Sequence, residues 1–159
     1  EKFRKDITLQ KAGEEDAELL HAMQVEAFRE LLDRYQDYDT NPAGETVEKV
    51  LFRLKQEFTY FYFICLNGRK AGAVRVVDRK EAGGNKRISP IFVLPEFQGK
   101  GIAQEAIRLC EALHGNGHWE LSTILQEKRN CYLYEKMGYH KTGETKTVNE
   151  RMTLVFYEK

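Results

Sequence analysis

The amino-acid sequence predicts one mixed α/β domain over residues 1–159, in which a single sheet is covered by helices. Three observations support this fold class. The length of 159 residues suits one domain, and a domain of this size buries roughly 68–70% of its unfolded surface. Segments with apolar residues at helical spacing lie between segments that alternate or are continuously apolar. The composition, 42% hydrophobic and 11% aromatic, is sufficient for a packed core.

The first third of the chain predicts one strand followed by two helices. The segment DITLQKA (6–12) alternates as a strand does. An acidic start and an apolar stripe then predict a long helix that ends near Tyr35. Residues 37–45 form a loop, in which Asn41-Pro42 is typical of a helix start. A second helix is predicted from a stripe made of Val47, Val50, Leu51, Leu54 and Phe58.

Strands dominate the next part of the chain. The apolar segment 60–66 is followed by Asn67-Gly68, a strong hairpin signal, and by a strand at 71–77 that returns antiparallel. Pro90 lies inside the next strand and requires a bulge or an edge position there. The later predicted elements are a strand at 87–95, a helix at 102–114, a strand at 118–125, a helix at 130–139 and one or two strands ending at 150–158.

The composition disfavours several classes of function. Lys plus Arg and Asp plus Glu both number 25, which argues against a nucleic-acid binder built on excess positive charge. No apolar run approaches 18 residues and EKFRKDITLQ is unlike a signal peptide, so we expect a cytoplasmic chain without a membrane partner. The odd set Cys65, Cys110 and Cys131 predicts reduced core thiols. Glycines separate His114 from His118, so we expect no metal site.

The segment FVLPEFQGKGIA joins a strand to a helix through two glycines. A helix start exposes N–H groups without partners and carries about half a positive charge, which suits an anion. Gly99 and Gly101 allow tight turns there, and Lys100 adds charge. No Ser or Thr follows the lysine as a Walker loop requires, and Gln104 replaces the last glycine of a dinucleotide fingerprint. From the glycines alone, a plain turn is an equal alternative.

Two motifs together resemble those of the GNAT superfamily (Gcn5-related N-acetyltransferases). Gln98, Gly101 and Ala103 fill the fixed positions of its acetyl-CoA loop, [Q/R]-x-x-G-x-[G/A]. The segment NCYLYEKMGY (130–139) resembles its later helix, L-Y-E-K-x-G-[F/Y]. By motif, the resemblance covers roughly residues 60–145. It implies a mostly antiparallel sheet of six or seven strands, about four flanking helices, and a splayed pair of strands that holds CoA.

The resemblance also implies a reaction and a set of binding residues. Acetyl-CoA would be the co-substrate, and its acetyl group would pass directly to a primary amine in a ternary complex. Main-chain groups of Ile91 and Val93 would bind the pantetheine arm, and the N–H near Val93 would stabilise the oxyanion. Asn130 would contact CoA. The pyrophosphate would be held by backbone N–H groups of Gln98, Gly99, Lys100, Gly101, Ile102, Ala103 and Gln104.

Tyr134 matches the tyrosine that serves as general acid in the family. A free tyrosine has a pKa of about 10, above a thiol's value of about 8.5, so it can protonate a departing thiolate only mildly. The alternative is an ordinary core tyrosine. Leu133 and Met137, four residues apart, predict the buried stripe of this helix. Tyr134 would lie about 100° off that face, which favours the acid.

The sequence departs from the family at two places. Glu127 stands where members often carry an asparagine. The strand segment 87–93 contains no acid that could serve as general base. Ser122 on the next strand stands where some members have a glutamate, and Glu120 shares its face by period two. A water chain through Ser89 or Ser122 is a further option, so the base is unassigned.

The acceptor pocket of the family maps to about residues 24–46. Glu26, Asp37, Tyr38 and Asp39 could attract a cationic amine there, and the alternative is a solvated loop. A small-molecule amine is the favoured acceptor. A protein lysine or N-terminus, and a non-catalytic acyl-CoA-binding sensor, are the other two hypotheses. The segment RMTLVFYEK at the C-terminal end suits pairing between two copies, so a homodimer is also considered.

Overall fold

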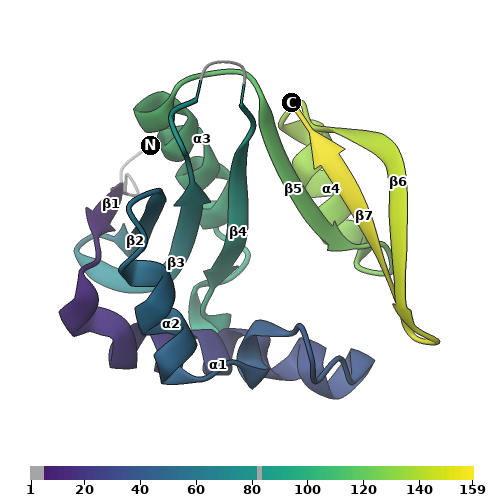
Figure 1. The fold of residues 1–159 in the computed structure, drawn as a ribbon, viewed down its shortest axis with the longest axis horizontal. Helices are drawn as coiled ribbons and strands as arrows, with labels where there is room; N and C mark the ends of the chain where they lie inside the picture. The colour runs from purple at the N-terminus through teal and green to yellow at the C-terminus, as the bar shows by residue number, and fades with distance from the viewer. Residues whose placement is uncertain (1–5, 82–83) are drawn as a thin grey trace.

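The computed structural model describes residues 6–81 and 84–159, so the prediction about a leader lies partly outside the described residues. Seven strands form one sheet in the order β1-β2-β3-β4-β5-β7-β6. The strands are β1 (Ile7–Lys11), β2 (Thr59–Leu66), β3 (Arg69–Val77), β4 (Lys86–Val93), β5 (Trp119–Ile124), β6 (His140–Asn149) and β7 (Met152–Glu158). The helices are α1 (Ala17–Tyr35), α2 (Val47–Leu54), α3 (Ile102–His114) and α4 (Lys128–Lys136). The predicted mixed, mostly antiparallel sheet is confirmed (Figure 1).

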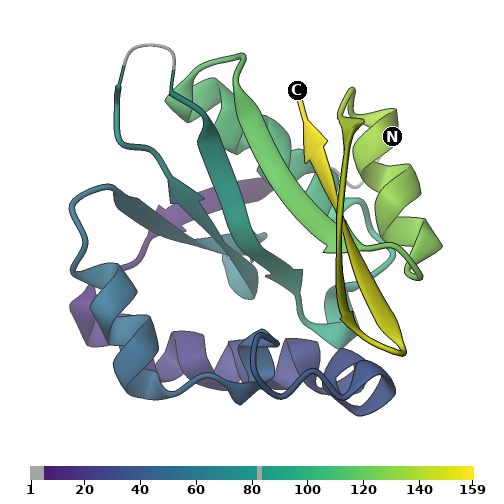
Figure 2. The ribbon, with the colours of Figure 1, turned by 45° about the vertical axis from the view of Figure 1, so that its right-hand side comes forward.

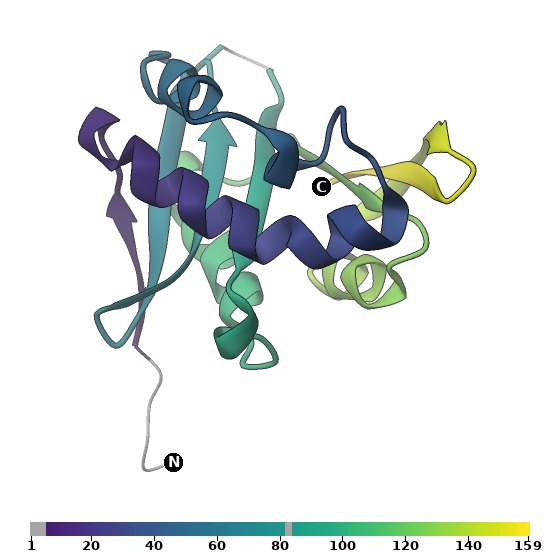
Figure 3. The same cartoon turned by 90° about the horizontal axis from the view of Figure 1, so that it is seen from below.

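Helices cover both faces of the sheet. Seen from below, α1 crosses under the strands and its C-terminal end reaches the side of α4 and β7 (Figure 3). On that face Phe28 of α1 meets Phe92 of β4 edge to face, with ring centroids 5.6 Å apart. On the other face, the Tyr139 hydroxyl just after α4 donates a 2.9 Å hydrogen bond to Glu111 of α3. The sheet therefore separates α1 and α2 from α3 and α4 (Figure 2).

Most predicted elements form within a few residues of their expected limits. Asn67 and Gly68 both have positive φ, 52° and 84°, as a two-residue hairpin turn with a primed geometry requires. The second helix was predicted too long, because α2 ends at Leu54 and Phe58 lies outside it. The last part contains two strands, and β6 is the one without a predicted range. Its residues are mostly polar and almost all exposed, so no apolar period marks it.

Among the strands in the described part of the chain, β4 and β5 are the only parallel neighbours, and they separate after two rungs. Lys86 is opposite Trp119 and Arg87 is opposite Glu120, after which pairing stops. Figure 1 shows the two strands diverging from these paired ends. The register of β4 with β3 shifts between Ile88 and Ile91, so Pro90 lies in the predicted bulge. A bulge bends its strand, and here the bend coincides with the point where β4 leaves β5.

A buried polar cluster fixes the far end of α3 to the sheet. The side chain of His114, the last residue of α3, bonds Asp78 through Nδ1 and the Tyr62 hydroxyl through Nε2, each at 2.9 Å. Burial alone would raise the pKa of Asp78, but hydrogen bonds from His114 and from the Lys80 N–H outweigh burial and lower it below 3.8. His114 thus anchors the end of α3 through these two contacts.

The three cysteines are buried and unpaired, as expected for core thiols. Burial raises the pKa of the Cys110 thiol to about 12, which keeps it protonated and unreactive. Among the residues described, none of the helices combines the length and apolarity that a membrane span requires.

We expect Asp78→Asn to reduce the free energy of unfolding at pH 7 by about 1.5–3 kcal/mol, because it removes a buried hydrogen bond to a charged group. The pKa of the Asp78 carboxyl is lower in the folded protein than its ordinary value of 3.8, so the stabilisation by Asp78 is present above pH 3.8. That stabilisation is lost as pH falls through the folded-state pKa of Asp78. Urea unfolding at pH 7 and near pH 3 tests this, with exposed Asp39→Asn as control. Equal stability of Asp78→Asn and wild type at pH 7 would contradict the role of the cluster.

Candidate active site

The open side of β4 presents main-chain groups to the gap left by β5. The Leu94 N–H donates to the Ala71 oxygen at 2.8 Å, so this residue faces β3. Main-chain groups alternate along a strand, and those of Ile91 and Val93 therefore point away from β3 toward the gap. The Val93 oxygen accepts a 3.1 Å hydrogen bond from Gln98 Nε2. The N–H groups of Ile91 and Val93 face the wedge-shaped opening between β4 and β5.

The loop after β4 leaves the start of α3 open to an anion. Gly99 and Gly101 have φ of 77° and 75°, the left-handed conformation that favours glycine. The first helical hydrogen bond runs from the Glu105 N–H to the Gly101 oxygen, at 3.2 Å. The preceding N–H groups, of residues 102–104, have no intrahelical partner, and no side chain caps this helix. The turn and the helix start are thus in the conformations that a phosphate cradle needs.

A cavity of about 700 Å³, called here the loop cavity, lies against this turn. It extends from the start of α3 to the last turns of α1 and the start of α4. Predicted cofactor-binding residues supply half of its lining, namely Val93, Gln98, Gly99, Gly101, Ile102, Ala103, Gln104 and Asn130. Lys100 belongs to the same turn but does not line this cavity. Arg129 also lines it, together with Arg34, whose charge is paired with Glu30 and Glu127 of the same lining.

A second cavity of about 290 Å³, called here the wedge cavity, lies between the separated strands. It is lined by Ile91 from β4, Ser122 from β5, Tyr134 from α4 and residues 40–42 from the loop after α1. Because α4 and this loop lie on opposite faces of the sheet, the cavity extends through the sheet. The two cavities share Leu31 and Asn130 in their linings, so they adjoin.

Tyr134 is buried, with only 8% of its surface exposed. Its ring contacts Tyr139 and Tyr157, with centroids 6.3 and 6.1 Å away. The prediction that it lies off the buried face of its helix is wrong. Packing of α4 on β5 and β7 buries Tyr134 and Cys131, while Leu133 is only partly buried. Burial raises the pKa of Tyr134 to about 12, with a smaller effect from Cys131.

The hydroxyl of Tyr134 is turned toward a cavity rather than committed to the protein. Tyr134 lines the wedge cavity, and no hydrogen bond joins its hydroxyl to another residue in the described part of the chain. Tyr139 and Tyr157, by contrast, donate to Glu111 and Glu135. Of the three packed tyrosines, Tyr134 is the one whose hydroxyl is available to a ligand.

The structure separates the other predicted residues. Ser122, a candidate base, lines the wedge cavity, whereas Glu120 does not. Asp37 is buried, lines the wedge cavity, and accepts hydrogen bonds from the Thr40 N–H and hydroxyl. Three further candidates for acceptor binding are exposed and line neither cavity, namely Glu26, Tyr38 and Asp39.

A bridge over the opening was not predicted from the sequence. Glu127, before α4, accepts hydrogen bonds from Arg34 at 2.6 Å and from the Tyr35 hydroxyl at 2.5 Å, both at the end of α1. Asn149 of β6 donates to the Tyr35 oxygen at 3.0 Å. These contacts hold the end of α1 to the β5–β7 half of the sheet. No sequence signal indicates them, because they join residues 93 and 114 positions apart.

The site contains no cluster of metal ligands. Within residues 6–81 and 84–159, no three His, Cys, Asp or Glu side chains lie close enough together to hold a metal ion.

Three features of this site are those of the acetyltransferase class of α/β fold. They are the separated strands β4 and β5, the uncapped start of α3 after the glycine turn, and the buried tyrosine that faces the gap. A sequence profile described as the acetyltransferase (GNAT) family matches residues 20–139. The chain belongs to this family, which confirms the family and the acyl-CoA-dependent acetyltransferase class that the two motifs predicted. Among curated proteins, none matches the chain in sequence.

Several solved structures share the fold at low sequence identity. Spermidine N-acetyltransferase from Vibrio cholerae, in complex with CoA and spermine, has a TM-score of 0.73 and 17% identity, covering 95% of this chain and 93% of that one. A Salmonella typhimurium acetyl transferase that modifies the N-terminal serine of ribosomal protein L7/L12 has a TM-score of 0.72 and 16% identity, covering 96% and 94%. The Microcin C7 self-immunity acetyltransferase, with acetyl-CoA and AMP, has a TM-score of 0.71 and 18% identity, covering 97% and 92%.

We expect Glu127→Ala to lower the free energy of unfolding by about 1–3 kcal/mol, because it leaves Arg34 and Tyr35 without their shared acceptor. Hydrogen exchange should quicken at residues 31–36, where the bridge holds the end of α1. Glu30→Ala is the matched control, since Glu30 is the other partner of Arg34 and its side chain is 84% exposed. Its loss should be within about 0.5 kcal/mol. Similar losses in both variants would argue against the bridge.

Proposed function

We propose that this protein transfers the acetyl group of acetyl-CoA directly to the primary amine of a small molecule. The observation that carries the proposal is the pair of adjoining cavities, which meet at Leu31 and Asn130. The loop cavity offers an anion cradle, and the wedge cavity offers exposed strand groups and a tyrosine hydroxyl. A donor with a diphosphate at one end and a thioester at the other fits this order of groups.

The donor is proposed to bind by backbone groups. The uncapped N–H groups of residues 102–104 and the turn around Gly99 and Gly101 would receive the pyrophosphate. The open N–H groups of Ile91 and Val93 would pair with the amide-bearing arm as a neighbouring strand does. Asn130, which lines both cavities, would contact the arm between them.

The chemistry then requires one new bond, one broken bond and two proton movements. The amine nitrogen attacks the thioester carbon, and a main-chain N–H near Val93 would stabilise the oxygen that gains charge. When the C–S bond breaks, sulfur takes the electron pair and a proton from the Tyr134 hydroxyl. The amine gives up a proton to water, with the candidate Ser122 hydroxyl as a relay, and Tyr134 regains a proton from solvent before the next turnover. Because burial raises the pKa of Tyr134 to about 12, its hydroxyl carries a proton throughout the neutral range.

The size of the wedge cavity favours a small acceptor over a protein. About 290 Å³ is available between the strands for the thioester end of the donor and the acceptor together. A polypeptide acceptor would need an open groove at this position. A protein that only binds acetyl-CoA, without transferring the acetyl group, would bind it equally well. Measured acetylation of amines therefore distinguishes the enzyme from that alternative.

Acetyl-CoA should raise the melting temperature of the wild-type protein. Saturation at 100 times the dissociation constant adds about 2.7 kcal/mol, and each kcal/mol is worth roughly 2–4 °C at this size. Gly101→Ala should lose most of this rise, because a left-handed alanine disturbs the cradle. Gly143→Ala is the control. Gly143 also has positive φ, and neither glycine has a neighbour within 4 Å of the added Cβ.

Both alanine variants should lose similar intrinsic stability, about 1–2 kcal/mol from the strained backbone. Only the Gly101 change should alter the effect of the ligand. A wild-type protein that does not respond to millimolar acetyl-CoA would remove the basis of the proposed function.

Tyr134→Phe should lower kcat by about 10²-fold, the lower end of the range for a general acid, because a thiolate is already a fair leaving group. The KM for acetyl-CoA should change little. Tyr132→Phe, on the same helix but 65% exposed, should leave kcat unchanged. With a pKa of about 12, Tyr134 should cause no fall in the wild-type rate below about pH 10. Unchanged turnover of Tyr134→Phe would exclude this hydroxyl as the acid.

A further inference from the structure

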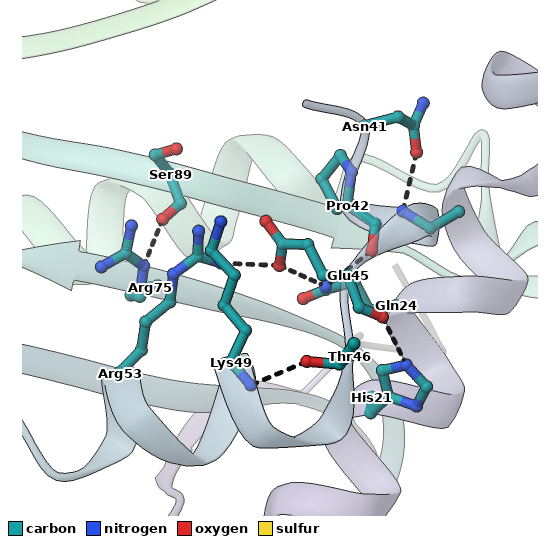
Figure 4. A network of polar contacts seen from close by, with 11 residues as sticks. His21, Gln24, Asn41, Pro42, Glu45, Thr46, Lys49, Arg53, Arg75 and Ser89 are labelled. Atoms are coloured by element: carbon teal, nitrogen blue, oxygen red, sulfur yellow. Dashed lines mark hydrogen bonds and ion pairs between the residues drawn. The ribbon is translucent and has the colours of Figure 1, made fainter. Parts of the chain in front are cut away.

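A cluster of arginines lies beside the wedge cavity, under α1 and α2. Figure 4 shows Arg53 of α2 facing Glu45, with Arg75 of β3 next to them and bonded to Ser89. The Glu45 carboxylate accepts from Arg53 at 2.7 Å and from Gln24 at 2.9 Å through the same oxygen. Arg75 Nε donates to the Ser89 oxygen at 2.6 Å. The one carboxylate in this network is therefore already shared.

The cluster has more positive than negative charge. Burial, followed by the nearby Arg53 guanidinium, lowers the pKa of Arg75 to about 10, and Arg87 contributes in the same direction. Arg75 thus stays charged at neutral pH, next to two like charges that the Glu45 carboxylate offsets in part. Its terminal nitrogens make no hydrogen bond within the described part of the chain. This region of low exposure favours an additional anion.

Arg87 brings this charge into the wedge cavity. It lies in the lining together with Ser89, Thr40 and Asp37. Glu120 is its neighbour in register on β5, yet the two side chains form no ion pair. In fact, no hydrogen bond or ion pair involves the Arg87 side chain among the described residues. Asp37 is the one carboxylate of this lining, and it is bonded to Thr40 instead.

We propose that the acceptor is a primary amine that also carries a carboxylate or phosphate group, and that Arg87 binds this group. The proposal rests on the function proposed above, and it names the class of acceptor for the same site. A guanidinium fits either anion with two parallel hydrogen bonds. Arg87 and Ile91 are four residues apart on β4, at most about 13 Å along the strand. A small bifunctional molecule can therefore place its anion at Arg87 and its amine near Tyr134.

Matched pairs of amines test the proposal with the intact protein and acetyl-CoA. Each pair contains an anionic amine and its neutral counterpart, so amino acids are compared with their carboxamides, and aminoalkyl phosphates with the parent amino alcohols. A linear diamine represents cationic acceptors. Release of the CoA thiol gives kcat/KM for each compound. We expect at least a tenfold preference for the anionic member of one series, and the series identifies the group as carboxylate or phosphate.

Variants at Arg87 assign the preference to this side chain. Arg87→Gln should reduce it below threefold, while its turnover of neutral amines and its melting shift with acetyl-CoA stay as in the wild type. Arg87→Lys keeps the charge without the paired hydrogen bonds and should retain an intermediate preference. Arg108→Gln, an arginine change on α3 with a 57% exposed side chain, is the control and should change nothing.

The outcomes separate this proposal from the one on which it depends. Acetylation of neutral amines or the diamine as efficiently as anionic amines would overturn the assignment of the acceptor and leave the acetyltransferase function intact. A preference that survives in Arg87→Gln would overturn the role of Arg87. A wild-type protein that binds acetyl-CoA but acetylates no amine would instead refute the proposed function, and the acceptor class with it.

Discussion

The site depends on one constraint, the separation of β4 and β5 after only two parallel rungs. A buried N–H or C=O group without a partner is costly, so two strands inside a sheet normally stay paired. Here the N–H groups of Ile91 and Val93 point into a gap that β5 does not fill. Only the acceptor groups of a strand-like molecule, or water, can satisfy them, whereas the Val93 oxygen already accepts from Gln98. The loop turn and the start of α3 lie at the wide end of this gap, where an extended ligand would leave it.

The chain maintains the separation with contacts on the other side of β4. Arg75 of β3 bonds the Ser89 oxygen at the bulge, and Pro90 has no N–H that could extend the pairing. Further along, β3 and β4 approach closely at Gly72, where an added Cβ would lie 2.1 Å from the Phe92 oxygen. The neighbour β3 therefore determines the path of β4. On the far side of the gap, the Glu127 bridge holds α1 over the opening.

Local signals predicted the parts of this site that are local. The turn at Asn67-Gly68, the limits of α3 and the left-handed Gly99 and Gly101 depend on neighbours in sequence. The burial of Tyr134 could not be predicted in this way, because α4 is too short for its apolar period to outweigh packing on β5 and β7. Likewise β6 is an exposed edge strand whose composition carries no period. Motif resemblance supplied the parted strands, which no local pattern encodes.

The charge of the acceptor region shows why composition cannot identify a substrate. The chain has equal numbers of acidic and basic residues, and the acidic loop suggested attraction of a cation. In the fold, Glu26 and Asp39 face solvent, where water and salt screen their charges. Arg53 and Arg75 lie partly buried beside the cavity, where a charge acts over a longer range. The buried carboxylate of the lining, Asp37, is bonded to Thr40, and Arg87 is the arginine of that lining that can contact a bound molecule.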